Sequence, residues 1–204
     1  MYQTLNNFIE SLGPISDSRK EILDEFVSYI VAKNNAKANI NLNFICTHNS
    51  RRSHMSQIWA QVASAFYNID KVNCYSGGTE ATAMFISVKE TLEDQGFVII
   101  KLSEGSNPVY AIKYDEDLLP IIAFSKTYDD NYNPKSNFAA VMTCDHADKN
   151  CPIIHGAEKR FAIRYRDPKE FDNTDLQKEK YKERSTQIAE EMFYVFKNVQ
   201  LKSE

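Results

Sequence analysis

The chain has 204 residues, a length that fits one large domain, and its 24 Lys and Arg against 28 Asp and Glu give a formal net charge of −4. The hydrophobic content of 43% is too high for a disordered chain, the charge balance lacks the basic surplus of nucleic-acid-binding proteins, and no apolar run is long enough to span a membrane. The N-terminus has no signal-peptide pattern, and four cysteines are too few for a disulfide scaffold. We therefore expect a cytoplasmic protein without nucleic-acid or membrane partners, whose cysteines serve catalysis, metal binding or packing.

Residues 1–38 are predicted to form a helical N-terminal extension. Apolar residues recur at helical spacing over residues 2–12, until a Gly-Pro pair ends the pattern. Ser18 and Glu21 have the spacing of a capping box before a second apolar stripe over residues 22–31. We interpret this extension as a packing or partner surface without chemistry of its own.

Residues 39–204 are predicted to form a single α/β domain. Strands that alternate with helices indicate a mainly parallel sheet flanked by helices. Two short apolar segments on either side of Asp115-Glu116-Asp117 predict an inserted β-hairpin, and Gly77-Gly78 predicts a turn after the second strand. The predicted strands are residues 40–46, 72–75, 97–102, 109–114, 121–124, 138–143 and 161–165, and the predicted helices are residues 55–66, 83–92 and 175–199.

The clearest chemical signal is a cysteine and an arginine placed between a predicted strand and a predicted helix. Loop amides and a helix N-terminus donate hydrogen bonds to a tetrahedral oxyanion, and an arginine adds a bidentate charged clamp. The same positive environment favours a thiolate, which is the nucleophilic form of cysteine. The alternative, a buried cysteine that only packs, leaves the arginine at this spacing unexplained. The loop consists of Cys46, Thr47, His48, Asn49, Ser50, Arg51, Arg52 and then Ser53, whose hydroxyl can donate to the Cys46 sulfur.

A second pair of cysteines, Cys144 and Cys151, lies in a polar segment after a predicted buried strand. Three interpretations are open. The two thiols can be zinc ligands together with His146 and His155, they can be unconnected, or they can form a redox pair that relieves Cys46. We favour the redox pair, because most zinc motifs contain a two-residue gap that this segment lacks.

The pair Asp167-Pro168 follows the last predicted strand. By itself this pair predicts only a turn. Asp167, Cys46 and Cys144 are all expected at the carboxyl ends of strands, however, where parallel sheets bind their ligands. A carboxyl group that faces an oxyanion can protonate a departing oxygen, which makes Asp167 the candidate acid.

The segment from Cys46 to Ser53 resembles the phosphate loop of low-molecular-weight protein tyrosine phosphatases and of thioredoxin-coupled arsenate reductases. Residues 144–152 and Asp167-Pro168 resemble the redox segment and the acid loop of the reductase branch. The resemblance covers roughly residues 40–200 apart from a middle region. It implies a low-molecular-weight-phosphatase-like fold, arsenate as substrate, no cofactor or metal, and thioredoxin as electron donor.

The resemblance also implies a role for each reactive residue. Cys46 attacks arsenate, which the loop and Arg52 hold, while Asp167 protonates the leaving oxygen. Cys144 then attacks Cys46 and arsenite is released. Cys151 moves the disulfide to Cys144–Cys151, where thioredoxin reduces it.

The remaining loop residues have supporting roles by the same resemblance. Asn49 shapes the loop and Ser53 tunes the thiolate. His48 stands where these loops commonly carry glycine, which raises the question of the backbone dihedral at that position. Arg51 adds a second positive charge beside the cradle. His54 is expected at the surface, where its charge can help to hold an anion.

Two other functions remain as alternatives. A phosphatase that acts on phosphotyrosine or small phosphate esters shares the first step but resolves the adduct with water instead of Cys144. A non-catalytic oxyanion-binding module uses the cradle without turnover, but such a module has no need of the acid Asp167.

Overall fold

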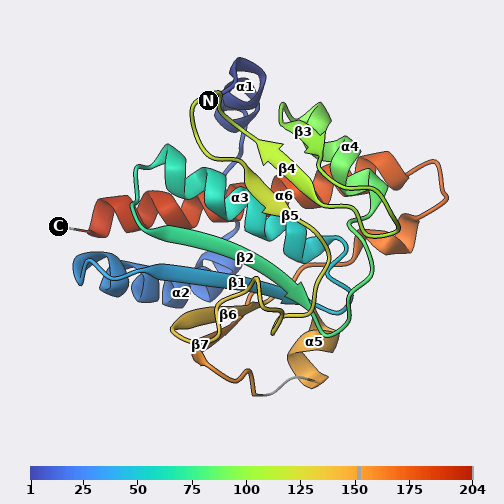
Figure 1. Ribbon diagram of the computed structural model, residues 1–204. Helices are drawn as coiled ribbons and strands as arrows, with labels where there is room; N and C mark the ends of the chain where they lie inside the picture. Colours follow the sequence, from blue (N-terminus) through green and yellow to red (C-terminus); the bar gives the residue numbers. More distant parts are fainter. Residues whose placement is uncertain (151–152, 204) are drawn as a thin grey trace.

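The computed structural model describes residues 1–150 and 153–203. Its elements alternate between helices and strands for most of the chain, as the sequence predicts (Figure 1). In chain order they are α1 (Gln3–Glu10), α2 (Asp17–Asn35), β1 (Ile40–Cys46), α3 (Arg52–Phe66), β2 (Val72–Gly78), α4 (Ile86–Asp94), β3 (Val98–Lys101), β4 (Tyr110–Lys113), β5 (Ile121–Ala123), β6 (Phe138–Met142), α5 (Asp145–Asn150), β7 (Ala157–Ala162), a 3₁₀ turn (Pro168–Phe171) and α6 (Gln177–Lys202).

A four-stranded parallel sheet in the order β2-β1-β6-β7 forms the centre of the molecule (Figure 1). Five of the seven residues of β1 are apolar (Ile40, Leu42, Phe44, Ile45 and Cys46), and they lie on both faces of the strand. Both faces can therefore be covered by other parts of the chain. The sheet with its flanking helices confirms the predicted α/β fold class. None of the helices within the described residues is long and apolar enough to cross a membrane.

The two faces of the sheet are covered differently. Helices α2, α3 and α6 pack together over the face that carries Leu42 and Phe44, and they enclose most of the hydrophobic core. A smaller cluster contains Ile45, which points to the opposite face, together with Cys46 at the end of β1 and with Cys144 and Ala147 of the segment after β6. The carboxyl end of β1 therefore places Cys46 in the same cluster as the second cysteine.

The inserted hairpin is confirmed. Strands β4 and β5 pair antiparallel, and β3 joins them as the outer strand of a separate three-stranded sheet. The strand predicted over residues 97–102 thus belongs to the insertion instead of to the parallel sheet. Helix α1 packs against this part of the chain: Gly96 has a φ of +103°, and a side chain there would meet the backbone of Leu5.

The turn predicted at Gly77-Gly78 is wrong. Strand β2 continues through both glycines and stays paired with β1, with Gly78 opposite Cys46. Glycine is needed here for close packing: a Cβ on Gly78 would lie 2.6 Å from the carbonyl oxygen of Thr47 and 2.7 Å from the amide nitrogen of Asn49. The two glycines therefore allow β2 to pack against the loop of residues 46–53.

Other boundaries also differ from the sequence prediction. Helix α2 begins at Asp17 after Ser16, and no side chain caps it, so the predicted capping box does not form. Strand β7 covers residues 157–162 and ends earlier than predicted. Helix α5 was not predicted, because a six-residue polar helix presents no apolar stripe to recognise.

Candidate functional site

The loop between β1 and α3 has the strand–loop–helix form that the sequence predicts. Cys46 is the last residue of β1, and α3 begins at Arg52. The Cys46 side chain is 4% exposed. The loop thus places a shielded sulfur beside the positive end of a 15-residue helix, which is a favourable place for an anion.

Asn49 and Ser53 form a hydrogen-bond chain to the sulfur. Asn49 Nδ2 donates to Ser53 Oγ over 2.8 Å, and Ser53 Oγ lies 3.0 Å from Cys46 Sγ. Because the Ser53 oxygen already accepts a hydrogen bond from the amide, its own proton is available to Cys46. A hydroxyl that donates to sulfur stabilises the thiolate over the thiol.

The unusual backbone dihedral of the loop lies at Asn49 and not at His48. Asn49 has a φ of +44°, in the left-handed region that asparagine tolerates better than most residues, and His48 is not among the residues with positive φ. His48 therefore needs no glycine-like freedom. Its imidazole Nε2 lies 3.6 Å from a carboxylate oxygen of the exposed Glu80.

Arg52 connects the loop to the predicted acid. One guanidinium nitrogen donates to the backbone oxygen of Tyr165 over 3.0 Å, and the other pairs with the Asp167 carboxylate. Arg52 Nε is buried and has no hydrogen-bond partner among the described residues. Asp167 lies five residues beyond β7 and accepts a hydrogen bond from the Lys169 amide at the start of the 3₁₀ turn. The fold thus brings together the predicted clamp and the predicted acid, which are 115 residues apart.

The neighbouring Arg51 is held by other groups. Its guanidinium pairs with Asp172, donates to the Tyr181 hydroxyl and lies over the Phe85 ring, 4.0 Å from the ring centroid. The same Tyr181 hydroxyl donates to Asp172 over 2.6 Å. This network ties the loop to α6. A direct contribution of the Arg51 charge to anion binding stays a prediction.

The expectation that His54 lies at the surface is wrong. His54 faces inward from α3, is completely buried, and contacts Ser76 Oγ through Nδ1 at 3.3 Å. Burial, together with the nearby Lys126 ammonium, lowers the pKa of His54 to about 3. His54 is therefore neutral at physiological pH and supplies no charge to the site.

Cys144 lies directly against the loop of residues 46–53. It follows β6, whose Met142 pairs with Ile45 of β1, and it is 1% exposed. Its Sγ lies 3.5 Å from Thr47 Oγ1 and accepts a hydrogen bond from the Ala147 amide at 3.4 Å. The second predicted cysteine thus contacts the residue next to Cys46.

Cys151, the third predicted participant, lies outside the described residues. The Cys144–Cys151 redox pair and the zinc alternative with His146 and His155 both depend on this residue and stay predictions. Among residues 1–150 and 153–203, no group of three or more His, Cys, Asp or Glu side chains is arranged to hold a metal ion.

Comparison with known proteins decides the family. No family model matches the chain. Arsenate reductase 2 of Staphylococcus epidermidis is 30% identical over 125 residues, which are 61% of this chain and 76% of that protein. The chain belongs to the arsenate reductase family. Its fold is also that of a solved YwlE mutant from Bacillus subtilis, with 13% identity, a TM-score of 0.51, and coverage of 78% of this chain and 97% of that chain.

A second solved structure aligns over most of the chain. It is the thioredoxin-dependent arsenate reductase Cg_ArsC1' of Corynebacterium glutamicum, which is 17% identical, with a TM-score of 0.42 and coverage of 98% of this chain and 83% of that chain.

In this member of the arsenate reductase family, a cavity of about 410 Å³ lies beside the loop. Arg52, Cys144, Tyr165 and Asp167 are among the residues that line it. Arg52, Asp167 and Cys144, the predicted clamp, acid and second cysteine, therefore face one space with room for a tetrahedral oxyanion.

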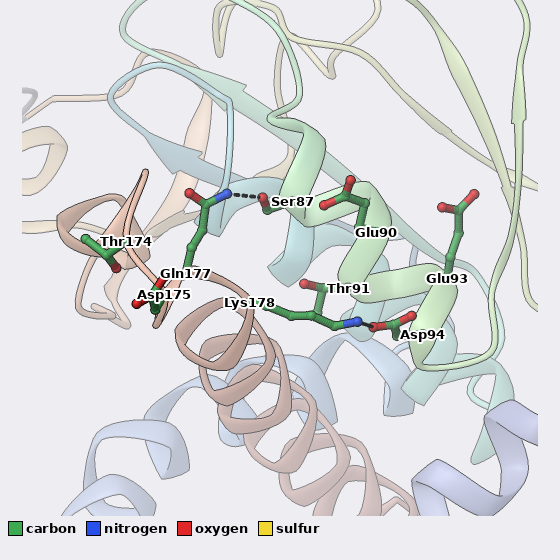
Figure 2. A pocket seen from close by; sticks show the side chains of 9 residues that line it. All are labelled: Ser87, Glu90, Thr91, Glu93, Asp94, Thr174, Asp175, Gln177 and Lys178. Carbon is green, nitrogen blue, oxygen red and sulfur yellow. Dashed lines mark hydrogen bonds and ion pairs between the residues drawn. The ribbon is translucent and has the colours of Figure 1, made fainter.

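A larger cavity of about 600 Å³ lies between α4 and the start of α6, away from this chemistry (Figure 2). Figure 2 shows Glu90, Glu93, Asp94 and Asp175 around it, with Lys178 paired to Asp94 at 2.8 Å. None of the predicted site residues lines this cavity. Its negative charge disfavours an oxyanion, so size alone does not locate the arsenate site.

Sequence patterns missed a group of residues that hold the loop from outside. Asn107, Ser125 and Lys126 belong to the insertion, and Thr82 to the connection between β2 and α4. Thr82, Ser125 and Lys126 contact the loop of residues 46–53, and Asn107 contacts Ser125. They follow no motif spacing, so no sequence signal was available to find them.

Proposed function

We propose that this chain reduces arsenate to arsenite, with Cys46 as nucleophile and Cys144 and Cys151 as an intramolecular disulfide relay. The observation that supports this proposal best is the position of Cys144. Its sulfur is buried in the same small apolar cluster as Cys46 and contacts Thr47 of the loop. A phosphatase that resolves its adduct with water needs no second thiol at that position.

In the first step, the Cys46 thiolate attacks arsenic and forms a sulfur–arsenic bond. Arg52 holds the oxyanion and stabilises the charge that develops on its oxygens. The anion competes with Asp167 for the guanidinium, and opening this ion pair frees the carboxyl group of Asp167 to carry a proton. Asp167 then protonates the departing oxygen, which leaves as water.

In the second step, the Cys144 thiolate attacks the sulfur of Cys46. A Cys46–Cys144 disulfide forms, and the electron pair of the broken sulfur–arsenic bond stays on arsenic. Arsenic is thereby reduced from the +5 to the +3 state and leaves as arsenite. The Ala147 amide that donates to Cys144 Sγ, at the start of α5, favours the thiolate that this step requires.

In the third step, Cys151 attacks Cys144 and releases Cys46 as a thiolate. The resulting Cys144–Cys151 disulfide is the two-electron-oxidised form of the protein, and a dithiol reductant returns both cysteines to thiols. We propose thioredoxin for this role because residues 144–152 resemble the redox segment of thioredoxin-coupled reductases. The cytoplasmic location expected from the sequence also stays a prediction.

The relay is tested by serine variants of its two cysteines. Cys144→Ser should stop catalytic release of arsenite after the first step. Cys151→Ser should allow one turnover and trap a Cys46–Cys144 disulfide, because nothing remains to relieve it. Reduced protein is incubated with arsenate and quenched with a thiol alkylator, and its disulfides are mapped by mass spectrometry while arsenite is quantified.

Cys74 provides the matched control for these variants. It is buried in β2, where burial raises the pKa of its thiol and keeps it unreactive, so Cys74→Ser should keep full turnover. If all four cysteines of the wild type are still alkylated after exposure to arsenate, and the protein hydrolyses a phosphate ester, the reductase proposal fails and the phosphatase alternative is supported. Zinc bound to the reduced protein would instead overturn the redox role of the pair.

A further inference from the structure

We propose that the inserted segment is part of the catalytic apparatus: Asn107 and Ser125 are positioning residues that hold the catalytic loop in its reactive conformation. The inference rests on the proposed function only in taking Cys46 as the nucleophile. It assigns a role to a region that the sequence marks as an addition to the compact fold.

The Ser125 hydroxyl connects the insertion to the loop directly. It donates to the carbonyl oxygen of His48 over 3.0 Å and accepts a hydrogen bond from the Thr82 amide over 2.8 Å. The Thr82 hydroxyl donates to the same His48 oxygen over 3.1 Å. Ser125 is 2% exposed, so its own hydroxyl is shielded from bulk water, whereas the Thr82 hydroxyl lies at the surface. These hydrogen bonds fix the peptide that immediately precedes Asn49.

Asn107 in turn fixes the backbone of Ser125. Asn107 Nδ2 donates to the Ser125 carbonyl oxygen over 2.8 Å, and Asn107 Oδ1 accepts a hydrogen bond from the Ser125 backbone amide over 3.1 Å. One side chain therefore satisfies both backbone groups of Ser125, as a neighbouring strand would. This reciprocal pair closes the base of the β4–β5 hairpin, because both strands lie between Asn107 and Ser125.

The next residue, Lys126, connects the insertion to the sulfur. Its amide donates to Asn49 Oδ1 over 2.9 Å. This contact sets the orientation of the Asn49 side-chain amide, because it leaves the NH₂ group to face Ser53. Asn49 Nδ2 donates to Ser53 Oγ, which leaves the Ser53 proton for Cys46. An unbroken chain of hydrogen bonds thus runs from the insertion to the nucleophile.

The segment is anchored firmly enough to act as such a support. The Gly78 amide donates to the Lys126 carbonyl over 2.9 Å, and the Tyr128 amide donates to the Gly78 carbonyl over 2.9 Å, so residues 126–128 add to the edge of β2 opposite Cys46. The Lys126 side chain is buried as well: its ammonium donates to the Phe124 carbonyl at 3.2 Å and lies 4.3 Å from the Phe124 ring centroid.

The test compares two serines of the insertion that make similar hydrogen bonds. Ser125→Ala removes the contact with the loop, whereas Ser103→Ala removes a hydrogen bond from the Val109 amide, 2.9 Å long, that does not touch the loop. The readout is the rate at which iodoacetamide alkylates Cys46 between pH 5 and pH 9, followed on the Cys46 peptide by mass spectrometry. The kcat and KM for arsenate are measured on the same variants.

Ser125→Ala should slow alkylation of Cys46 at pH 6 by about tenfold and move the pH profile to higher pH, because the chain of hydrogen bonds to the sulfur loosens. Ser125→Thr, which keeps the hydroxyl, should restore the profile, and Ser103→Ala should leave it unchanged. Asn107→Ala should act in the same direction as Ser125→Ala, and it provides the measurement if that variant does not fold.

A profile of Ser125→Ala and Asn107→Ala that superposes on the wild type would overturn the inference. Equal slowing by Ser103→Ala would also overturn it, because the effect would then be general loosening of the insertion. Alkylation requires no arsenate, so the result is independent of the reductase proposal. If wild type fails to reduce arsenate while Ser125→Ala still slows alkylation, the proposed function fails and the positioning role stands.

Discussion

The two halves of the candidate site are held by different kinds of interaction. The loop of residues 46–53 is fixed on its outer side by hydrogen bonds from backbone amides and hydroxyls of the β2–α4 connection and of the insertion. Helix α5, which follows Cys144, is held to β7 and the segment after it by charged side chains. Arg160 and Arg164 both pair with Asp148, and Arg164 also pairs with Asp145.

This difference matches what each half has to do under the proposed mechanism. A loop that stabilises charge in a transition state must be rigid before the reaction begins, and a dense set of hydrogen bonds provides that rigidity. The α5 side must change its arrangement, because Cys144 has to reach first Cys46 and then Cys151. We expect a six-residue helix that is held by ion pairs and by a small apolar cluster around Cys144 and Ala147 to detach locally at a smaller free-energy cost than the loop.

The largest effect is expected from Arg52→Lys, which breaks the rigid half. A lysine cannot contact the Tyr165 oxygen and hold two oxygens of an oxyanion together, because it lacks the planar fork of the guanidinium. We expect kcat/KM for arsenate to fall by about 10²–10³-fold. Arg51→Lys is the matched control: it should lower the melting temperature by loosening the pairs with Asp172 and Tyr181, with a smaller loss of turnover. Equal losses of turnover would contradict separate roles for the two arginines.

The pH dependence of stability sharpens the comparison, since a buried neutral histidine lies beneath the rigid half. The pKa of His54 is about 3 in the folded chain, against about 6.5 in an unfolded one, so only the unfolded chain takes up a proton between these values. The stabilisation is complete above pH 6.5 and is lost as the pH falls toward 3. We expect His54 to contribute a loss of about 1.4 kcal/mol per pH unit below pH 6. The free energy of unfolding, measured by urea at several pH values, should depend less steeply on pH in His54→Asn than in wild type. Identical pH dependence in the two proteins would contradict a neutral His54.

The smallest effect is expected on the α5 side, from Asp148→Asn. The Asp148 side chain is 7% exposed, but Arg160 and Arg164 are more accessible and can be solvated when the carboxylate is lost. We expect the free energy of unfolding to fall by about 1 kcal/mol, with faster amide exchange in residues 145–150 and little change in the loop. Asp145→Asn, which removes one exposed pair, should have a smaller effect. If Asp148→Asn accelerated amide exchange in the loop as much as in residues 145–150, the two halves would not be held independently.

The sequence determined the parts of this protein that depend on local spacing. A strand that ends at Cys46 and a helix that begins at Arg52 follow from alternation and from helical periodicity, which act over a few residues. The same reasoning found the hairpin of β4 and β5 and the position of Cys144 at the end of a buried strand. It placed His54 at the surface, however, because a polar residue in the first turn of a helix is most often exposed.

Tertiary structure alone decided how these local pieces meet. Arg51 and Arg52 are adjacent and identical in type, yet one pairs with Asp172 and the other with Asp167, more than 100 residues away in both cases. The support of the loop by Ser125 spans 77 residues. Such contacts are set by packing of whole elements against one another, and hydrogen bonds between distant side chains leave no periodic trace in the sequence.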